Sequence, residues 1–201
     1  VREGGELTIA VRDADIPVAK ALCEEIKQKV VQLFEKYNIN CVPINGFEIA
    51  SKMGIKVIPY SSKTCKVREL CLKESEDGFS IKRNNKWYIF YNDADGKQFG
   101  RVNNTMLHEI GHIVLDHTED SELAEKEVKF FAKYALVPPV LVHKLKLTSP
   151  EEISETFDVS YEAAYYALVY YNKWLRYGGR YYKPYEEQLL ALFSNNTLSL
   201  G

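Results

Sequence analysis

The chain has 201 residues, of which 46% are hydrophobic and 27% charged, so it can build a sizeable core and does not have the composition of a disordered protein. A formal net charge of −2 gives no global electrostatic reason to expect nucleic acid or an anionic membrane as the main partner. No segment approaches the roughly 20 apolar residues that span a bilayer, and the N-terminal residues lack the apolar stretch of a signal peptide. We therefore expect a cytoplasmic protein that does not contact membranes.

The N-terminal part of the chain predicts two helices. Asp15 can cap a first helix, Pro17 suits its first turn, and apolar residues repeat at helical spacing as far as Tyr37. A shorter helix at about 46–53 ends at Gly54, and the chain then becomes extended.

A small sheet is predicted next. Three strand-like segments follow at about 64–73, 78–83 and 86–91. Asn84 and Asn85 separate the last two and tolerate the left-handed conformations of a tight hairpin. These features predict an antiparallel sheet.

From about residue 104 the chain returns to helix, and beyond Pro138 the helices become short. The order of helices, sheet and helices indicates an α+β fold. We expect a core over residues 1–137 and a C-terminal helical module over 138–201 that packs on it.

One motif in the predicted central helix indicates a metal-binding site. His108 and His112 lie four residues apart, so on a helix their imidazoles stand one above the other and can bind a single ion, with Glu109 beside it. Apolar residues surround them, so the helix is expected to be buried and its polar side chains need partners. The alternative is two core histidines with ordinary hydrogen bonds. We consider it weaker because burying two imidazoles and a carboxylate together is unfavourable unless they bind a common ligand.

A catalytic zinc ion usually takes three protein ligands, so a third must lie elsewhere. We prefer Glu127, which is embedded among Leu123, Phe130 and other apolar residues of the next helix. Glu125 is neighboured by charged residues and is interpreted as part of a solvated face. An ion pair between Glu127 and a basic residue is the alternative for this carboxylate.

The two remaining histidines are less favoured as ligands. His117 would lie on the opposite side of the helix from His108 and better suits the helix C-terminus, where an imidazole meets free carbonyls. His143 is expected at the surface. The preferred site, with zinc as its ion, predicts peptide hydrolysis in which Glu109 removes a proton from water and returns it to the leaving amine.

The sequence resembles the ImmA/IrrE family of metallopeptidases. The resemblance lies in residues 104–117 (NTMLHEIGHIVLDH), 127–132 (EVKFFA), 136–138 (LVP) and 157–160 (FDVS), with Val128 where Ala is common. It implies a zincin-like minimal metallopeptidase core, with N-terminal helices, a small antiparallel sheet, an HExxH helix and a helix carrying the glutamate ligand. It also implies His108, His112 and Glu127 as Zn2+ ligands and Glu109 as the catalytic residue.

The resemblance further implies a protein substrate, namely a helix-turn-helix repressor of a mobile element, a phage or a stress regulon, whose cleavage releases transcription. Many relatives have an Arg after the Val-Ser segment, whereas this chain has Ala167 and lacks that side chain.

Two non-enzymatic functions remain as alternatives. Residues 149–177 have the rhythm of a helix-turn-helix, but the second helix has no Lys or Arg before Lys173, so we do not expect direct DNA binding. A metal-binding scaffold could sequester a repressor without cutting it, although zinc binding alone does not require Glu109.

Overall fold

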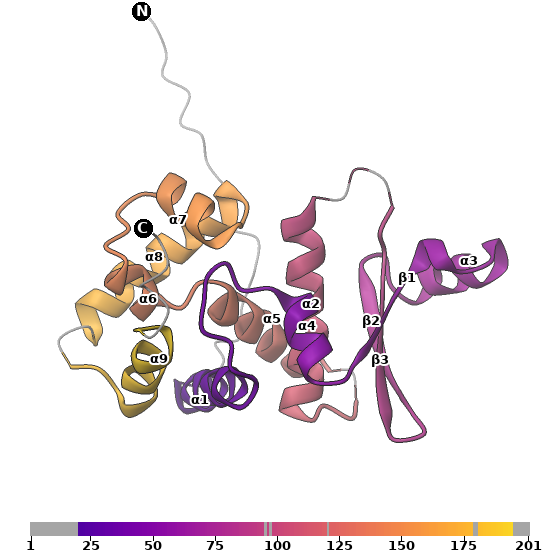
Figure 1. Ribbon diagram of the computed structural model, residues 1–201, viewed down its shortest axis with the longest axis horizontal. Coiled ribbons are helices and arrows are strands. Elements are labelled where there is room, and N and C mark those ends of the chain that lie inside the picture. Colours follow the sequence, from indigo (N-terminus) through magenta and orange to yellow (C-terminus); the bar gives the residue numbers. More distant parts are fainter. Residues whose placement is uncertain (1–19, 95, 97, 120, 179–180, 195–201) are drawn as a thin grey trace, which may run out of the picture.

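The computed structural model describes residues 20–94, 96, 98–119, 121–178 and 181–194. The predicted helix start at Asp15 and Pro17 lies outside this part of the chain. Figure 1 shows a small sheet at one end of the molecule, helices α1, α4 and α5 in the middle, and the C-terminal helices at the other end. Within the described residues, none of the helices has the length and apolar character needed to cross a bilayer.

The sheet has three strands in the order β1-β3-β2. The bounds are Lys56–Pro59 for β1, Gly78–Arg83 for β2 and Lys86–Tyr91 for β3. Asn84 and Asn85 join β2 to β3 with φ angles of 50° and 59°, which confirms the predicted hairpin. β1 pairs with β3 in parallel, so the sheet is mixed and the expectation of a purely antiparallel sheet is wrong in this respect.

The predicted strand at 64–73 is also wrong, because this segment forms helix α3, Cys65–Glu74. Its apolar residues have no buried stripe that would reveal the helical period: Leu70 is 63% exposed and Val67 41%, and Cys71 is the buried one. The 3-10 turn η1, Tyr60–Ser62, leads from β1 toward α3.

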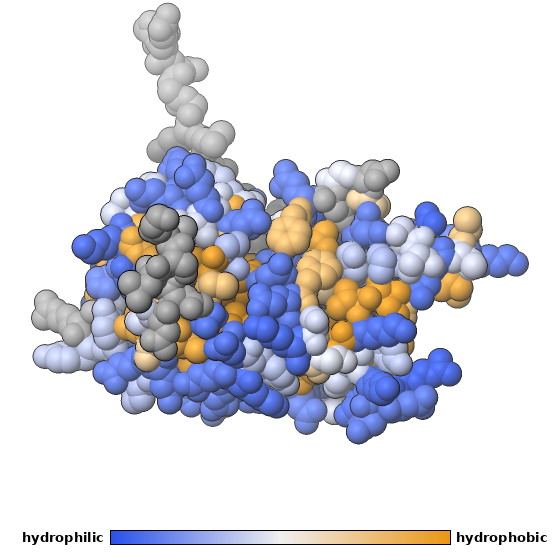
Figure 2. Space-filling view, viewed as in Figure 1, coloured by the Kyte–Doolittle hydropathy of each residue, from blue (hydrophilic) through white to orange (hydrophobic). Residues whose placement is uncertain are grey.

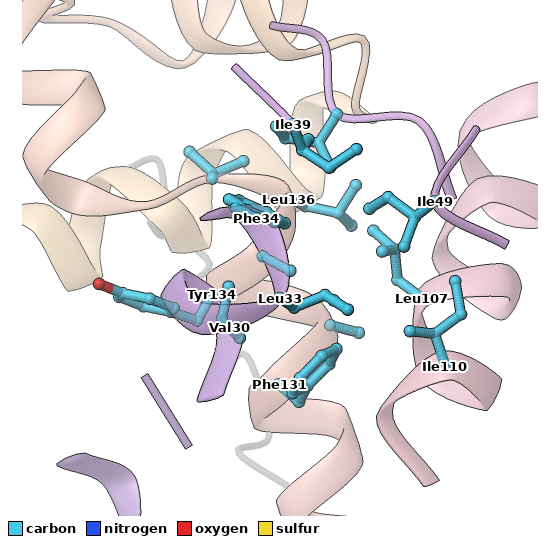
Figure 3. Close-up of a cluster of buried hydrophobic side chains, with 14 of the residues drawn as sticks. Val30, Leu33, Phe34, Ile39, Ile49, Leu107, Ile110, Phe131, Tyr134 and Leu136 are labelled. Carbon is cyan, nitrogen blue, oxygen red and sulfur yellow. The ribbon is translucent and has the colours of Figure 1, made fainter. Parts of the chain in front are cut away.

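Helix α4, Phe99–Leu115, contacts the sheet on one side and helix α5, Glu122–Leu136, on another. Helix α1, Lys20–Tyr37, packs on α5, and α2, Gly46–Lys52, packs on α4. Figure 3 shows Leu107 and Ile110 of α4 turned toward a cluster that includes Leu33 of α1 and Phe131 of α5. The helix with the HExxH motif is therefore held in the middle of the core.

Polar and aromatic contacts fix α2 against α4. Buried Asn103 of α4 accepts a hydrogen bond from the Gly46 amide at 2.7 Å and donates one to the Ile44 carbonyl at 2.8 Å. The ring of Phe47 lies 5.3 Å from that of Tyr91 and 6.2 Å from that of Phe99. Figure 2 shows apolar side chains on the surface between α2, α4 and the sheet.

The C-terminal helices are α6, Pro139–Lys144, α7, Pro150–Phe157, α8, Tyr161–Tyr177, and α9, Pro184–Ser194. Ser149 caps α7 in a capping box with Glu152, and Ser160 caps α8, as these residue types favour. Val140 and Leu189 of this part are fully buried in the same hydrophobic cluster as Val30 of α1. The α+β class is confirmed, whereas the division of the chain at residue 137 stays a prediction.

Candidate metal centre

Helix α4 carries the two histidines of the motif side by side. The rings of His108 and His112 have centroids 5.0 Å apart, as expected for residues four apart on a helix. Their side chains are 21% and 16% exposed, so both are mostly buried but can still be reached from solvent. Glu109, between them in the sequence, is only 6% exposed.

Glu125, in the first turn of α5, faces both imidazoles. Its Oε1 lies 3.2 Å from His112 Nε2, and its Oε2 lies 3.6 Å from His108 Nε2. One ligand atom from each of the three residues lies within 4.8 Å of the others. Ser121 fixes the start of α5 by accepting a hydrogen bond from the Ala124 amide at 3.0 Å.

The structure does not bring Glu127 into this group. The Glu127 carboxylate lies 2.9 Å from Nε2 of His117. The preference for Glu127 treated Leu123 as part of the buried stripe of the helix, but Leu123 is 51% exposed, and the stripe runs instead through Ala124 and Val128. At 100° per residue, Glu125 and Glu127 flank that stripe on opposite sides.

His117 lies at the C-terminus of α4, as expected, but its ring packs against that of His112, with centroids 5.3 Å apart, and not on the side of the helix opposite the motif. Asp116 ends the helix in the left-handed conformation, and the His117 amide bonds to the His112 carbonyl at 3.1 Å. The Nδ1 atom of His117 lies 3.2 Å from Nδ1 of His112.

His143, which was expected at the surface, is half-buried. Its Nδ1 lies 2.9 Å from the Tyr171 hydroxyl, and its ring is part of an aromatic cluster with Trp174 and Tyr182. The reason is that α6 packs on α8, which the local sequence could not show.

His108, His112 and Glu125 line a cleft of about 980 Å3. Helix α3 and strand β2 line the side opposite α4 and α5, through Leu70, Cys71, Phe79, Ser80 and Ile81. β2 pairs with β3 and has no second strand partner among the described strands, so it is an edge strand that lines the cleft. Sequence reasoning missed this wall because it treated α3 as a strand.

The electrostatics favour a neutral His108 imidazole that can bind a cation. Burial lowers the pKa of His108, and the nearby His112 and Lys129 lower it further, although Glu125 opposes them. A neutral imidazole keeps the lone pair that a metal requires. Two imidazole nitrogens and one carboxylate, converging beside an open cleft, match the three protein ligands of a catalytic zinc site.

A comparison with models of protein families matches residues 50–169 to a peptidase family described as the IrrE N-terminal-like domain. The matched segment includes the sheet, α4 with its motif, and α5. A comparison with curated proteins finds no match.

Proposed function

The chain belongs to the ImmA/IrrE family of metallopeptidases, and from this premise we propose that it is a zinc-dependent endopeptidase. In this proposal His108, His112 and Glu125 hold the zinc ion, and Glu109 is the general base. The observation that supports it most is the position of the Glu125 carboxylate against Nε2 of both histidines. Glu127, which the sequence favoured as the third ligand, is paired with His117 instead.

The zinc ion and Glu109 would have separate roles in peptide hydrolysis. Zinc, when bound, lowers the pKa of water to about 7 and polarises the substrate carbonyl. Glu109 is buried beside His108 and lines the same cleft, so its carboxylate is suited to accept the proton of the attacking water. The same carboxyl group then donates that proton to the nitrogen of the leaving peptide.

Strand β2 supports a role in holding an extended peptide. Its outer edge carries backbone N–H and C=O groups that an added strand can pair with, next to the two histidines. Exposed apolar residues on this wall, Leu70 and Ile81, are suited to contact substrate side chains. These features suit a protein or peptide substrate better than a compact small molecule.

As the substrate we propose a helix-turn-helix transcriptional repressor in the cytoplasm, whose cleavage derepresses genes of a phage, a mobile element or a stress regulon. This part rests on membership of the family and on no geometric feature of the site.

A non-cleaving regulator is the second candidate function, and one observation favours it. Helices α7 and α8 meet through a turn at Asp158, and the start of α8 exposes Tyr161, Tyr165 and Tyr166 by 51–58%. Exposed tyrosines suit contact with a protein, whereas DNA binding would need cations in this turn. This surface is compatible with capture of a repressor, whether or not cleavage follows.

Incubation with the helix-turn-helix regulator encoded beside the gene, followed by intact-mass spectrometry, tests the proposal. The zinc-loaded protein is expected to cut the regulator, and the Glu109→Gln variant, loaded with the same amount of zinc, is expected to leave it intact. A stable complex without fragments, formed by a protein with one bound zinc, would favour the non-cleaving regulator. A protein that binds no zinc would overturn the metallopeptidase proposal.

A further inference from the structure

We propose that Glu127 and His117 form a positioning pair that orients the imidazole of His112 at the metal. This inference rests on the proposed function, because it concerns the metal centre of that function. It assigns a role to the carboxylate that the sequence suggested as a ligand and that the structure places outside the ligand group.

His112, His117 and Glu127 form one chain of contacts that begins at Glu125. Nε2 of His112 faces Glu125 at 3.2 Å, and Nδ1 of His112 lies 3.2 Å from Nδ1 of His117. On the far side of the His117 ring, Nε2 lies 2.9 Å from Oε2 of Glu127. His112 is thus held from one side by the ligand group and from the other by this pair.

The proton positions required by these contacts are mutually consistent. A nitrogen that binds a metal carries no proton, so binding through Nε2 of His112 leaves its proton on Nδ1 as a hydrogen-bond donor. Nδ1 of His117 must then accept, which places the proton of His117 on Nε2. That N–H donates to the Glu127 carboxylate, so every nitrogen in the chain has one role.

The backbone brings these groups together. The left-handed turn at Asp116 and the bond from the His117 amide to the His112 carbonyl fold the His117 ring back against the last turn of α4. The side chains of His117 and Glu127 are only 13% and 14% exposed, so water competes weakly for their hydrogen bond. Helix α5 supplies both the ligand Glu125 and the supporting Glu127.

Glu127 and His117 are expected to increase metal affinity through the chain of hydrogen bonds that leads to the ligand His112. A carboxylate that accepts from a histidine chain fixes the ring orientation and increases the basicity of the nitrogen that binds the metal. Loss of such partners typically weakens metal affinity about 10–100-fold.

Zinc affinity of the full chain, measured by competition with a chelator, tests this inference in Glu127→Ala, His117→Ala and the double variant. We expect each single variant to bind zinc about 10–100-fold more weakly than the wild type. The zinc affinity of the double variant should be close to that of the single variant that binds more weakly, because both changes break the same chain of hydrogen bonds. Glu122→Ala, at an exposed position of the same helix, is the matched control and should leave the affinity unchanged.

The absorption spectrum of the cobalt-substituted protein gives a second readout, since it reports the geometry of the ligands. The spectrum should change in Glu127→Ala, and Glu127→Gln, which keeps an acceptor oxygen of similar shape, should restore part of the affinity. Circular dichroism of the metal-free variants separates loss of the fold from loss of the site, and a variant that fails to fold is replaced by its Gln counterpart.

Zinc affinities within twofold of the wild type in both single variants, with unchanged cobalt spectra, would overturn the inference. Loss of zinc binding in Glu127→Ala as complete as in His108→Ala would also overturn it, because Glu127 would then be a ligand, while the peptidase proposal would stand. A wild-type protein that binds no zinc would overturn both.

Discussion

Gly111 of α4 lies directly against Val128 of α5, between the two helices that carry the candidate metal centre. A Cβ atom on Gly111 would lie 3.3 Å from Cβ of Val128 and 3.1 Å from Cδ1 of Phe131, both tighter than ordinary contacts. Because α5 packs so closely on the motif helix, Glu125 at its start can reach His108 and His112.

Replacement of Gly111 by Val should therefore separate the helices. The added isopropyl group meets a β-branched side chain and a buried ring, and we expect a loss of about 2 kcal/mol in the free energy of unfolding together with weaker zinc binding. Urea denaturation of the metal-free protein and a zinc titration measure the two effects. Gly100→Ala, on the same helix with only an ordinary contact at 3.5 Å, is the control and should not destabilise the protein.

Asn103→Ala should destabilise the protein by about 3 kcal/mol. The change leaves the Gly46 amide and the Ile44 carbonyl without their partner at a buried position, and each unsatisfied buried group costs about 1–3 kcal/mol. Thermal and urea unfolding measure the effect, with exposed Asn104→Ala as the control. Equal stability of the two variants would show that this link between α2 and α4 contributes little.

Glu24 should make stability depend on pH in the acid range. Burial alone would raise its pKa, but hydrogen bonds from Lys183, Lys27 and Tyr185 outweigh burial and lower the pKa from 4.5 to about 2. The carboxylate contributes its full stabilisation above pH 4.5, and the contribution is lost as the pH falls through about 2.

The matching experiment compares Glu24→Gln with the wild type, both metal-free, from pH 7 to pH 2. We expect Glu24→Gln to be less stable at pH 7 by about 1 kcal/mol, a modest value because the site is partly exposed. The difference should shrink below pH 4.5. Exposed Glu25→Gln is the control, and a difference that stays constant down to pH 2 would contradict the assigned role.

Glu109→Gln should separate metal binding from catalysis. The amide keeps the shape of the side chain but cannot accept a proton, so peptide cleavage should fall at least about 10²-fold while zinc affinity stays within a few-fold. Single-turnover cleavage and chelator competition measure the two quantities. Cleavage at the wild-type rate would show that another group is the general base.

Features encoded over a few residues were predictable from the sequence. The spacing of His108 and His112 in an apolar helix, the Asn84-Asn85 turn and the Ser160 cap of α8 each follow from local rules, and the structure has all three.

Features that depend on distant contacts were not predictable. The parallel pairing of β1 with β3 joins segments about 30 residues apart, and exposed α3 has no buried stripe that would reveal its period. Which of Glu125 and Glu127 lies beside the two histidines depends on how α5 packs on α4, where Val128 lies against Gly111. A single sequence gives no signal for such a contact.

The most direct test of the proposed centre is a crystal structure of the zinc-loaded protein, with diffraction data collected on both sides of the zinc absorption edge. We predict one anomalous peak about 2.0–2.2 Å from His108 Nε2, His112 Nε2 and a Glu125 carboxylate oxygen. Glu127 should remain hydrogen-bonded to His117. A zinc ion held by Glu127 in place of Glu125, or no peak between the two histidines, would contradict the proposed centre.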